Sequence, residues 1–287
     1  MIAMNTMRNK GYSGPTTEES PFSARSVALS LLLGSHPPRL STSVIVASGS
    51  LFGINAGTMR TALSRMATKG EVAATDSGYE LAGPLVERQR RQDVGRRSPA
   101  PEWDGRWVSV APRHSSRELS ERRELRRRLE RTGFGELRPD YWLRPANRDL
   151  PHLGSDLVVT IGELVVDDLN ALAGELWPLD ELDAEAGRLL SEAQQLVDRE
   201  SGLGTESELH PDLGSWLTET FTVSAEIVRF LTREPRLPSS LVRQPWSPDL
   251  LRQAYNALEQ LFQGHLARFL LLQQAAVTSP EGAESRR

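Results

Sequence analysis

Apolar residues recur at helical spacing near the start of the chain. They do so from Phe22 to Leu33, and Gly34 then predicts the end of a first helix. Ser41 and the two polar residues after it can cap a short second helix, which we expect from Val44 to about Leu51.

A third helix is predicted over Gly57–Lys69, with Asn55 as its N-cap. Its apolar positions form a single stripe, made by Met59, Ala62, Leu63 and Met66. The opposite face carries only short hydrogen-bonding side chains and arginines, namely Thr58, Arg60, Thr61, Ser64 and Arg65. A β-hairpin is expected next, with strands at 71–74 and 79–81.

Three helices followed by a hairpin is the element order of a winged helix-turn-helix. In that fold a polar helix face enters the major groove of DNA, so the residues expected to bind DNA are Asn55, Thr58, Arg60, Thr61, Ser64 and Arg65. The alternative is a generic small α+β module whose polar helix face is merely solvated.

The pattern changes after residue 105, where short strands alternate with one charged helix. Strands are predicted at 107–110 and 157–161, a helix at 116–131, and a hairpin over 134–143. This succession of a strand, a helix, a hairpin and a last strand is typical of a small ferredoxin-like domain.

Helical periodicity dominates the remainder of the chain. The helices are expected near 168–176, 180–197, 216–232 and 249–276. The predicted fold class is therefore α+β and mainly helical. Its expected parts are a disordered leader (1–21), a winged helix-turn-helix (22–82), a linker (83–105), a ferredoxin-like central domain (106–163), a helical C-terminal domain (164–276) and a disordered tail (277–287).

Charge is distributed unevenly along the chain. Residues 22–97 hold ten basic and five acidic side chains, whereas residues 146–287 hold eleven basic and 23 acidic ones. The first stretch is thus net +5 and the second net -12, which favours a polyanionic partner for the N-terminal part alone. The arginines at 88, 90, 91, 96 and 97 are interpreted either as a phosphate-contacting arm or as an exposed connector.

The motifs of common catalytic and cofactor sites are absent from the sequence. It has no cysteine, its five histidines lack ligand-like spacing, and no phosphate-binding loop or nucleophile motif occurs. We therefore expect neither an enzyme nor a metal or cofactor site. No apolar run is long enough to cross a membrane, and no signal peptide opens the chain, so we expect a cytoplasmic protein.

Several stretches resemble the PaaX family, which comprises repressors of phenylacetate catabolism and related transcriptional regulators. They include Arg25-Ser26, Gly53-Ile54-Asn55, the run from Met59 to Met66, and Trp103-Asp104-Gly105-Arg106-Trp107. The resemblance continues to about Phe262 through Trp142-Leu143-Arg144-Pro145 and Leu176-Trp177-Pro178-Leu179. It implies a winged helix, a Cas2-like central domain, a homodimer on an inverted repeat, and an aryl acyl-CoA thioester as effector.

The resulting expectation is a DNA-binding transcriptional regulator, acting as a repressor that an effector releases from double-stranded operator DNA. One alternative is a Cas2-like nucleic-acid-processing or RNA-binding module. A metal-dependent nuclease would want an acidic residue on the first central strand, and Trp107-Val108-Ser109-Val110 offers none. Another alternative is a purely dimerising interaction protein. The sequence does not indicate the operator, the effector-binding residues or a role for the hairpin.

Overall fold

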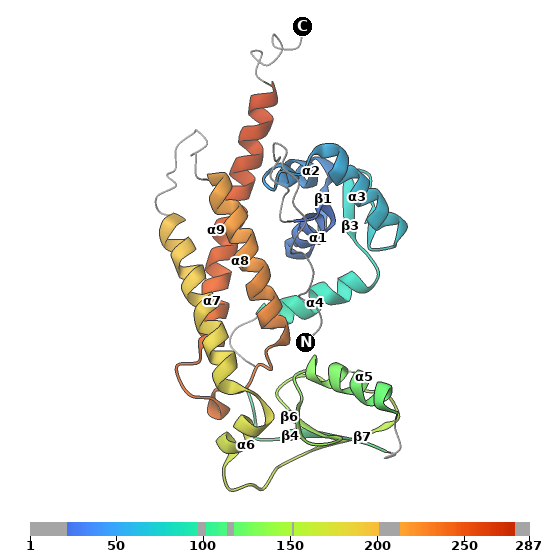
Figure 1. The fold of residues 1–287 in the computed structure, drawn as a ribbon, viewed down its shortest axis with the longest axis vertical. Coiled ribbons are helices and arrows are strands. Elements are labelled where there is room, and N and C mark those ends of the chain that lie inside the picture. The colour runs from blue at the N-terminus through green and yellow to red at the C-terminus, as the bar shows by residue number, and fades with distance from the viewer. Residues whose placement is uncertain (1–21, 97–101, 114–117, 151, 201–212, 279–287) are drawn as a thin grey trace, which may run out of the picture.

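The computed structural model describes residues 22–96, 102–113, 118–150, 152–200 and 213–278. Figure 1 shows a small helical part with a short sheet, a separate sheet crossed by one helix, and a bundle of long helices. This arrangement confirms the predicted mainly helical α+β class. The predicted leader and all but two residues of the predicted tail lie outside the described residues, and those two, 277 and 278, belong to the last helix.

The N-terminal part has the predicted order of three helices and a hairpin. Its elements are α1 (Ala24–Gly34), β1 (Arg39–Ser41), α2 (Thr42–Ser50), α3 (Ala56–Thr68), β2 (Val72–Ala74) and β3 (Gly78–Leu81). The strands form an antiparallel sheet in the order β1-β3-β2. Strand β1 is an addition to the prediction. It can pair closely with β3 because Gly78 has no side chain. A Cβ at that position would lie only 2.0 Å from the carbonyl oxygen of Leu40.

Most of the predicted linker that the structure describes is a helix, α4 (Pro84–Arg96). Its sequence is polar almost throughout, so periodicity gives little sign of it. The helix is stabilised by tertiary contacts: Gln89 Nε2 donates to the carbonyl oxygens of Leu33 (3.0 Å) and Ser35 (2.9 Å) at the end of α1. These bonds satisfy carbonyls that the end of a helix leaves without partners.

The central part is an antiparallel sheet with the strand order β5-β6-β4-β7. Its elements are β4 (Trp107–Pro112), α5 (Leu119–Glu130), β5 (Gly135–Arg138), β6 (Tyr141–Pro145) and β7 (Leu157–Gly162). Helix α5 packs Leu125 and Leu129 onto one face of the sheet. The other face packs Trp107 and Leu143 against the first helix of the C-terminal part.

The C-terminal part is helical, as predicted. Its elements are α6 (Leu169–Leu176), α7 (Leu179–Glu200), α8 (Leu213–Arg233), the short 3-10 helix η1 (Ser239–Leu241) and α9 (Ser247–Thr278). Helices α7, α8 and α9 pack along one another (Figure 1). Five aromatic residues of this part are buried, namely Trp216, Phe221, Phe230, Trp246 and Tyr255.

One hydrophobic core joins the N-terminal part to the long helices. It contains residues of α1 and α3 together with residues of α7, α8 and α9. The ring of Phe221 on α8 lies 4.7 Å from that of Phe52, measured between centroids, and Phe22 packs edge-on against both. The N-terminal part is therefore fixed to the bundle by apolar packing.

Candidate nucleic-acid interface

Helix α3 is held by a narrow apolar stripe. Met59, Leu63 and Met66 are fully buried against α1, α2 and the sheet. Helix α2 can approach closely because Gly49 has no side chain, since a Cβ there would lie 2.8 Å from the methyl carbon of Met59. Gly53, with a φ of +67°, makes the turn between α2 and α3. This packing fixes which face of α3 points outward.

All six residues predicted to bind DNA are exposed at the start of α3 or along its outer face. Residues 58, 61 and 65 follow one row of the helix surface, and residues 60 and 64 follow the adjacent row. The structure therefore brings the six side chains to one surface. It also places α3 on the side of the N-terminal part away from the bundle (Figure 1).

Two of the six residues also make bonds within the helix. Asn55 Oδ1 accepts a hydrogen bond from the backbone N–H of Thr58 at 2.8 Å, as expected of an N-cap. This leaves its amide nitrogen as the group that can donate to a partner. Thr61 Oγ1 donates to the carbonyl oxygen of Gly57 at 2.9 Å, so its remaining lone pairs can only accept.

The arginines of α3 carry the positive charge of this surface. Neither Arg60 nor Arg65 takes part in an ion pair found between described residues. An exposed guanidinium without a carboxylate partner keeps all its donors for guanine edges or phosphate oxygens.

The hairpin next to α3 offers no cation at its turn. The turn runs from Thr75 to Gly78, and its exposed charged side chain is Asp76. The carbonyl oxygen of Ser77 accepts a hydrogen bond from the N–H of Thr42 at 3.1 Å, which ties the hairpin to the start of α2. The hairpin is thus well placed beside the helices but contributes a negative charge.

The arginines of α1 and α4 are mostly paired with carboxylates. On α4, Arg90 and Arg91 each lie 3.8 Å from Glu87, and the buried Arg96 binds Asp93 and Glu259. Arg25 donates twice to the carboxylate of Glu71, at 2.9 and 2.8 Å. Partial burial lowers the pKa of Arg88, and the charges of Arg25 and Arg91 lower it further. The sequence pointed to the arginines of α4 but not to their proximity to Arg25.

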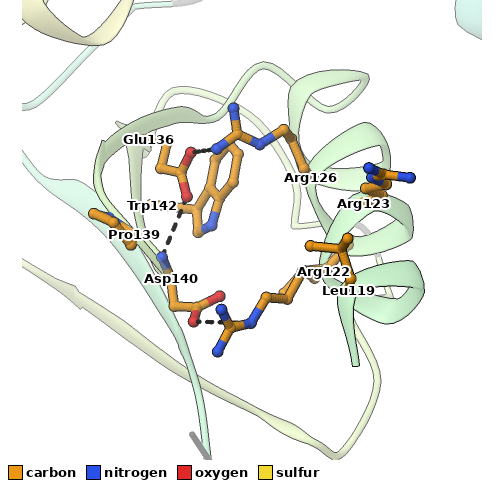
Figure 2. A pocket seen from close by; sticks show the side chains of 9 residues that line it. Leu119, Arg122, Arg123, Arg126, Glu136, Pro139, Asp140 and Trp142 are labelled. Atoms are coloured by element: carbon orange, nitrogen blue, oxygen red, sulfur yellow. Dashed lines mark hydrogen bonds and ion pairs between the residues drawn. The ribbon is translucent and has the colours of Figure 1, made fainter. Parts of the chain in front are cut away.

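Two arginines of α5 face carboxylates inside the central part. A cavity of about 220 Å³ lies between α5 and the β5–β6 hairpin, and Figure 2 shows arginines and acids facing each other across it. Arg126 binds Glu136 and lies over the ring of Trp142, while Arg122 Nε lies 3.9 Å from Asp140. Local carboxylates neutralise these charges, so α5 is a weaker candidate for a phosphate surface than α3.

A set of buried arginines, which no pattern in the sequence indicates, lies where α4 meets the rest of the molecule. Arg252 and Glu234 form a completely buried ion pair, and Arg252 Nε donates to the carbonyl oxygen of Gly95 at 3.0 Å. Arg236 donates to the carbonyl oxygen of Val94, and Asn147 Nδ2 donates to that of Arg236 at 3.2 Å. Side chains of the C-terminal part thus cap the end of α4. The bond from Asn147 to the backbone of Arg236 links the same region to the central part.

Another buried arginine lies within the central part. Arg144 lies over the ring of Phe134, and its Nη2 donates to the carbonyl oxygens of Arg148 (3.3 Å) and Asp149 (2.9 Å). Burial lowers its pKa to about 10. Nothing in the sequence separates Arg144 from the exposed arginines, because its burial depends on strand pairing.

In the part of the chain that the structure describes, no group of three or more His, Asp or Glu side chains could hold a metal ion. Within those same residues, no helix combines the length and the apolar character that crossing a bilayer requires.

Family models match the N-terminal and central parts of this chain, and a solved structure is similar over most of its length. A family model described as PaaX-like protein matches residues 23–85, and a model described as PaaX protein central Cas2-like domain matches residues 100–152. The structure of the uncharacterized protein Rv0674 from Mycobacterium tuberculosis is similar with a TM-score of 0.68 and 30% sequence identity. That similarity covers 86% of this chain and 98% of the other. No curated protein matches the chain.

Proposed function

The chain belongs to the PaaX family of transcriptional regulators, and we propose that it binds an inverted-repeat DNA operator as a homodimer and represses transcription until an effector releases it. The observation that carries this proposal is the exposed face of α3. It presents two arginines without ion-pair partners among described residues, and several short hydrogen-bonding side chains, on a helix fixed by buried methionines and leucine.

Helix α3 enters the major groove in the proposed complex. Arg60 and Arg65 bind guanine edges or phosphates, because their donors are fixed as planar forks that match these acceptors. Asn55, Thr58, Thr61 and Ser64 add hydrogen bonds near the N-terminus of the helix and along its outer face.

The effector acts between the central and C-terminal parts in this proposal, and family resemblance suggests an aryl acyl-CoA thioester. The buried arginines at the end of α4 support such a route, since Arg236 and Arg252 both bind carbonyl oxygens at the end of α4, and Arg236 also accepts a hydrogen bond from Asn147 of the central part. Half-sites on DNA lie about 34 Å apart. A small rotation of one subunit relative to the other therefore changes how well the two recognition helices fit their half-sites. A ligand that weakens DNA binding must itself bind less tightly to the DNA complex.

The test is a fluorescence anisotropy titration of DNA from upstream of the protein's own gene. Arg65→Ala should weaken binding by roughly 5- to 150-fold, because a direct base contact contributes about 1–3 kcal/mol. The matched control is Arg229→Ala, which removes the same charge from an exposed position on α8 in the acidic part. Both variants should unfold thermally like the wild type.

Unchanged affinity of Arg65→Ala would contradict the placement of α3 in the groove. Equal losses in the two variants would point to a general charge effect in place of a contact made by α3. Absence of DNA binding by the wild-type protein would favour a purely dimerising interaction protein.

A further inference from the structure

The cavity between α5 and the β5–β6 hairpin combines a buried apolar floor with charged walls. Trp142 and Leu125 are 2% and 4% exposed, whereas Leu119 is 64% exposed and borders solvent. The charged side chains around the space are Arg122, Arg123, Arg126, Glu136 and Asp140 (Figure 2). The volume of about 220 Å³ is below the roughly 300–1,000 Å³ of sites for drug-sized ligands, so the cavity suits a small molecule.

The indole of Trp142 contributes a hydrogen-bond donor that the protein leaves unused. Its Nε1 is buried, and no described residue accepts a hydrogen bond from it. Figure 2 shows the nitrogen edge of the ring turned toward the centre of the cavity, and the guanidinium of Arg126 lies over the ring at 5.7 Å from its centroid. A buried donor without an acceptor is costly, so a ligand that supplies an acceptor here gains affinity.

Asp140 contributes an acceptor on the opposite side of the space. Its φ of 63° is unusual for a residue other than glycine, and its N–H donates to Glu136 Oε1 at 3.2 Å. The turn directs the Asp140 carboxylate toward α5 (Figure 2), where its Oδ2 lies 3.9 Å from Arg122 Nε, beyond hydrogen-bond distance. The carboxylate of Glu136 is instead bound directly by Arg126. Asp140 therefore keeps the capacity to accept a hydrogen bond from a ligand.

We propose that this cavity binds a small ionised carboxylic acid with a hydroxyl or amino group on the carbon next to the carboxylate. A carboxylate oxygen accepts from Trp142 Nε1, and the neighbouring hydroxyl or ammonium donates to Asp140. The remainder of the ligand is apolar and packs on Leu119, Leu125 and Pro139.

The charge of the lining selects among such ligands. It holds three arginines and two acids, so a bound monoanion brings the net charge of the site to zero. A hydroxy acid should therefore bind more tightly than the corresponding zwitterionic amino acid. Inorganic phosphate fits less well, because it would leave the apolar surfaces of Leu119 and Pro139 uncovered and place further negative oxygens beside Asp140.

The first experiment is isothermal titration calorimetry of the full chain with three ligands of one carbon skeleton. The ligands are 2-hydroxy-3-methylbutanoate, valine and 3-methylbutanoate, which carry a hydroxyl, an ammonium and a hydrogen at the same carbon. The hydroxy acid should bind with a dissociation constant of about 1 mM or lower. Its affinity should exceed that of 3-methylbutanoate by about 10-fold, because only the hydroxyl donates to Asp140. Valine should lie between the two, and inorganic phosphate should not compete.

Two variants remove the proposed hydrogen bonds one at a time. Trp142→Phe should weaken binding of the hydroxy acid by about 10- to 150-fold, because the donor to a charged acceptor is lost. The matched control is Trp103→Phe, which removes an indole N–H that donates to the carbonyl oxygen of Arg106 and does not line the cavity. Asp140→Gly, which the positive φ allows, should abolish the preference for the hydroxy acid over 3-methylbutanoate. Circular dichroism should show each variant folded.

Failure of the hydroxy acid to bind at concentrations up to about 10 mM would overturn the site. Equal affinity of the wild type and Trp142→Phe would do the same, as would competition by phosphate. An unchanged preference in Asp140→Gly would contradict the second hydrogen bond, and this ratio remains measurable if Trp142→Phe does not fold. The site goes beyond the proposed function. None of the titrations contains DNA, so their outcome is separate from that of the operator titration.

Discussion

At the scale of single residues, the exposed and the buried arginines of this protein have opposite roles. Those of α3 lie in solvent without ion-pair partners among described residues, and so remain available to a ligand. Arg252 is completely buried, with Glu234, Asp249 and the carbonyl oxygen of Gly95 as its partners. The apolar stripe of α3 predicts that its arginines are exposed, whereas the burial of Arg252 depends on segments that are distant in the sequence.

The buried pair gives a prediction on stability. Arg252→Met should lower the free energy of unfolding by about 3–5 kcal/mol, because it leaves the Glu234 carboxylate buried without its main counter-charge. Urea denaturation followed by circular dichroism measures the change. Adding Glu234→Gln should restore part of the loss, since the uncompensated charge is then removed.

Arg243→Met is the control for this measurement, because Arg243 is exposed on the loop before α9. Its effect should stay within about 0.5 kcal/mol. Equal effects of the two methionine variants would show that the buried pair contributes nothing specific.

At the scale of elements, α4 shows how a segment without apolar periodicity becomes a helix. Helix α4 lies between the N-terminal part and α8. Gly95 allows α4 and α8 to approach closely. A Cβ on Gly95 would lie 2.6 Å from the carbonyl oxygen of Leu231, a backbone atom that cannot move aside cheaply.

We therefore expect Gly95→Ala to destabilise the protein by about 1–3 kcal/mol through overpacking, although alanine favours helices. The matched control is Gly187→Ala in the interior of α7, where the nearest atom to a new Cβ is 3.8 Å away. That variant should be neutral or stabilised by up to about 1 kcal/mol. Differential scanning calorimetry compares the two, and a stabilised Gly95→Ala would contradict the close packing of α4 on α8.

At the scale of the whole molecule, the separation of charge sets how DNA binding responds to salt. The N-terminal stretch of net +5 includes α3 and α4, whereas the last half of the chain is net -12. If about 6–10 phosphates are neutralised per complex, affinity should fall roughly 10³- to 10⁵-fold between about 50 and 200 mM salt. Binding titrations over that range give the slope, and an affinity independent of salt would contradict a complex anchored on phosphates.

The amino-acid sequence by itself determined most of the elements and their order, with β1 and α4 as the main exceptions. The stripe of Met59, Leu63 and Met66 fixed which face of α3 is buried, because a helix with one apolar row can pack in only one orientation. The outward position of Arg60 and Arg65 followed from the same row. Alternation of apolar and polar residues, together with turn residues, predicted the central strands. Helical periodicity predicted the long C-terminal helices.

Only the tertiary structure decided which parts share a core and which surfaces remain uncovered. Phe52 and Phe221 meet although 169 positions separate them, and the order of the strands places β7 at an edge of the central sheet. A sequence pattern shows that a residue is apolar or charged, but its partners come from distant segments. The burial of Arg252 and the exposure of Ile161 are therefore properties of the assembled fold, because each depends on which elements pack beside it.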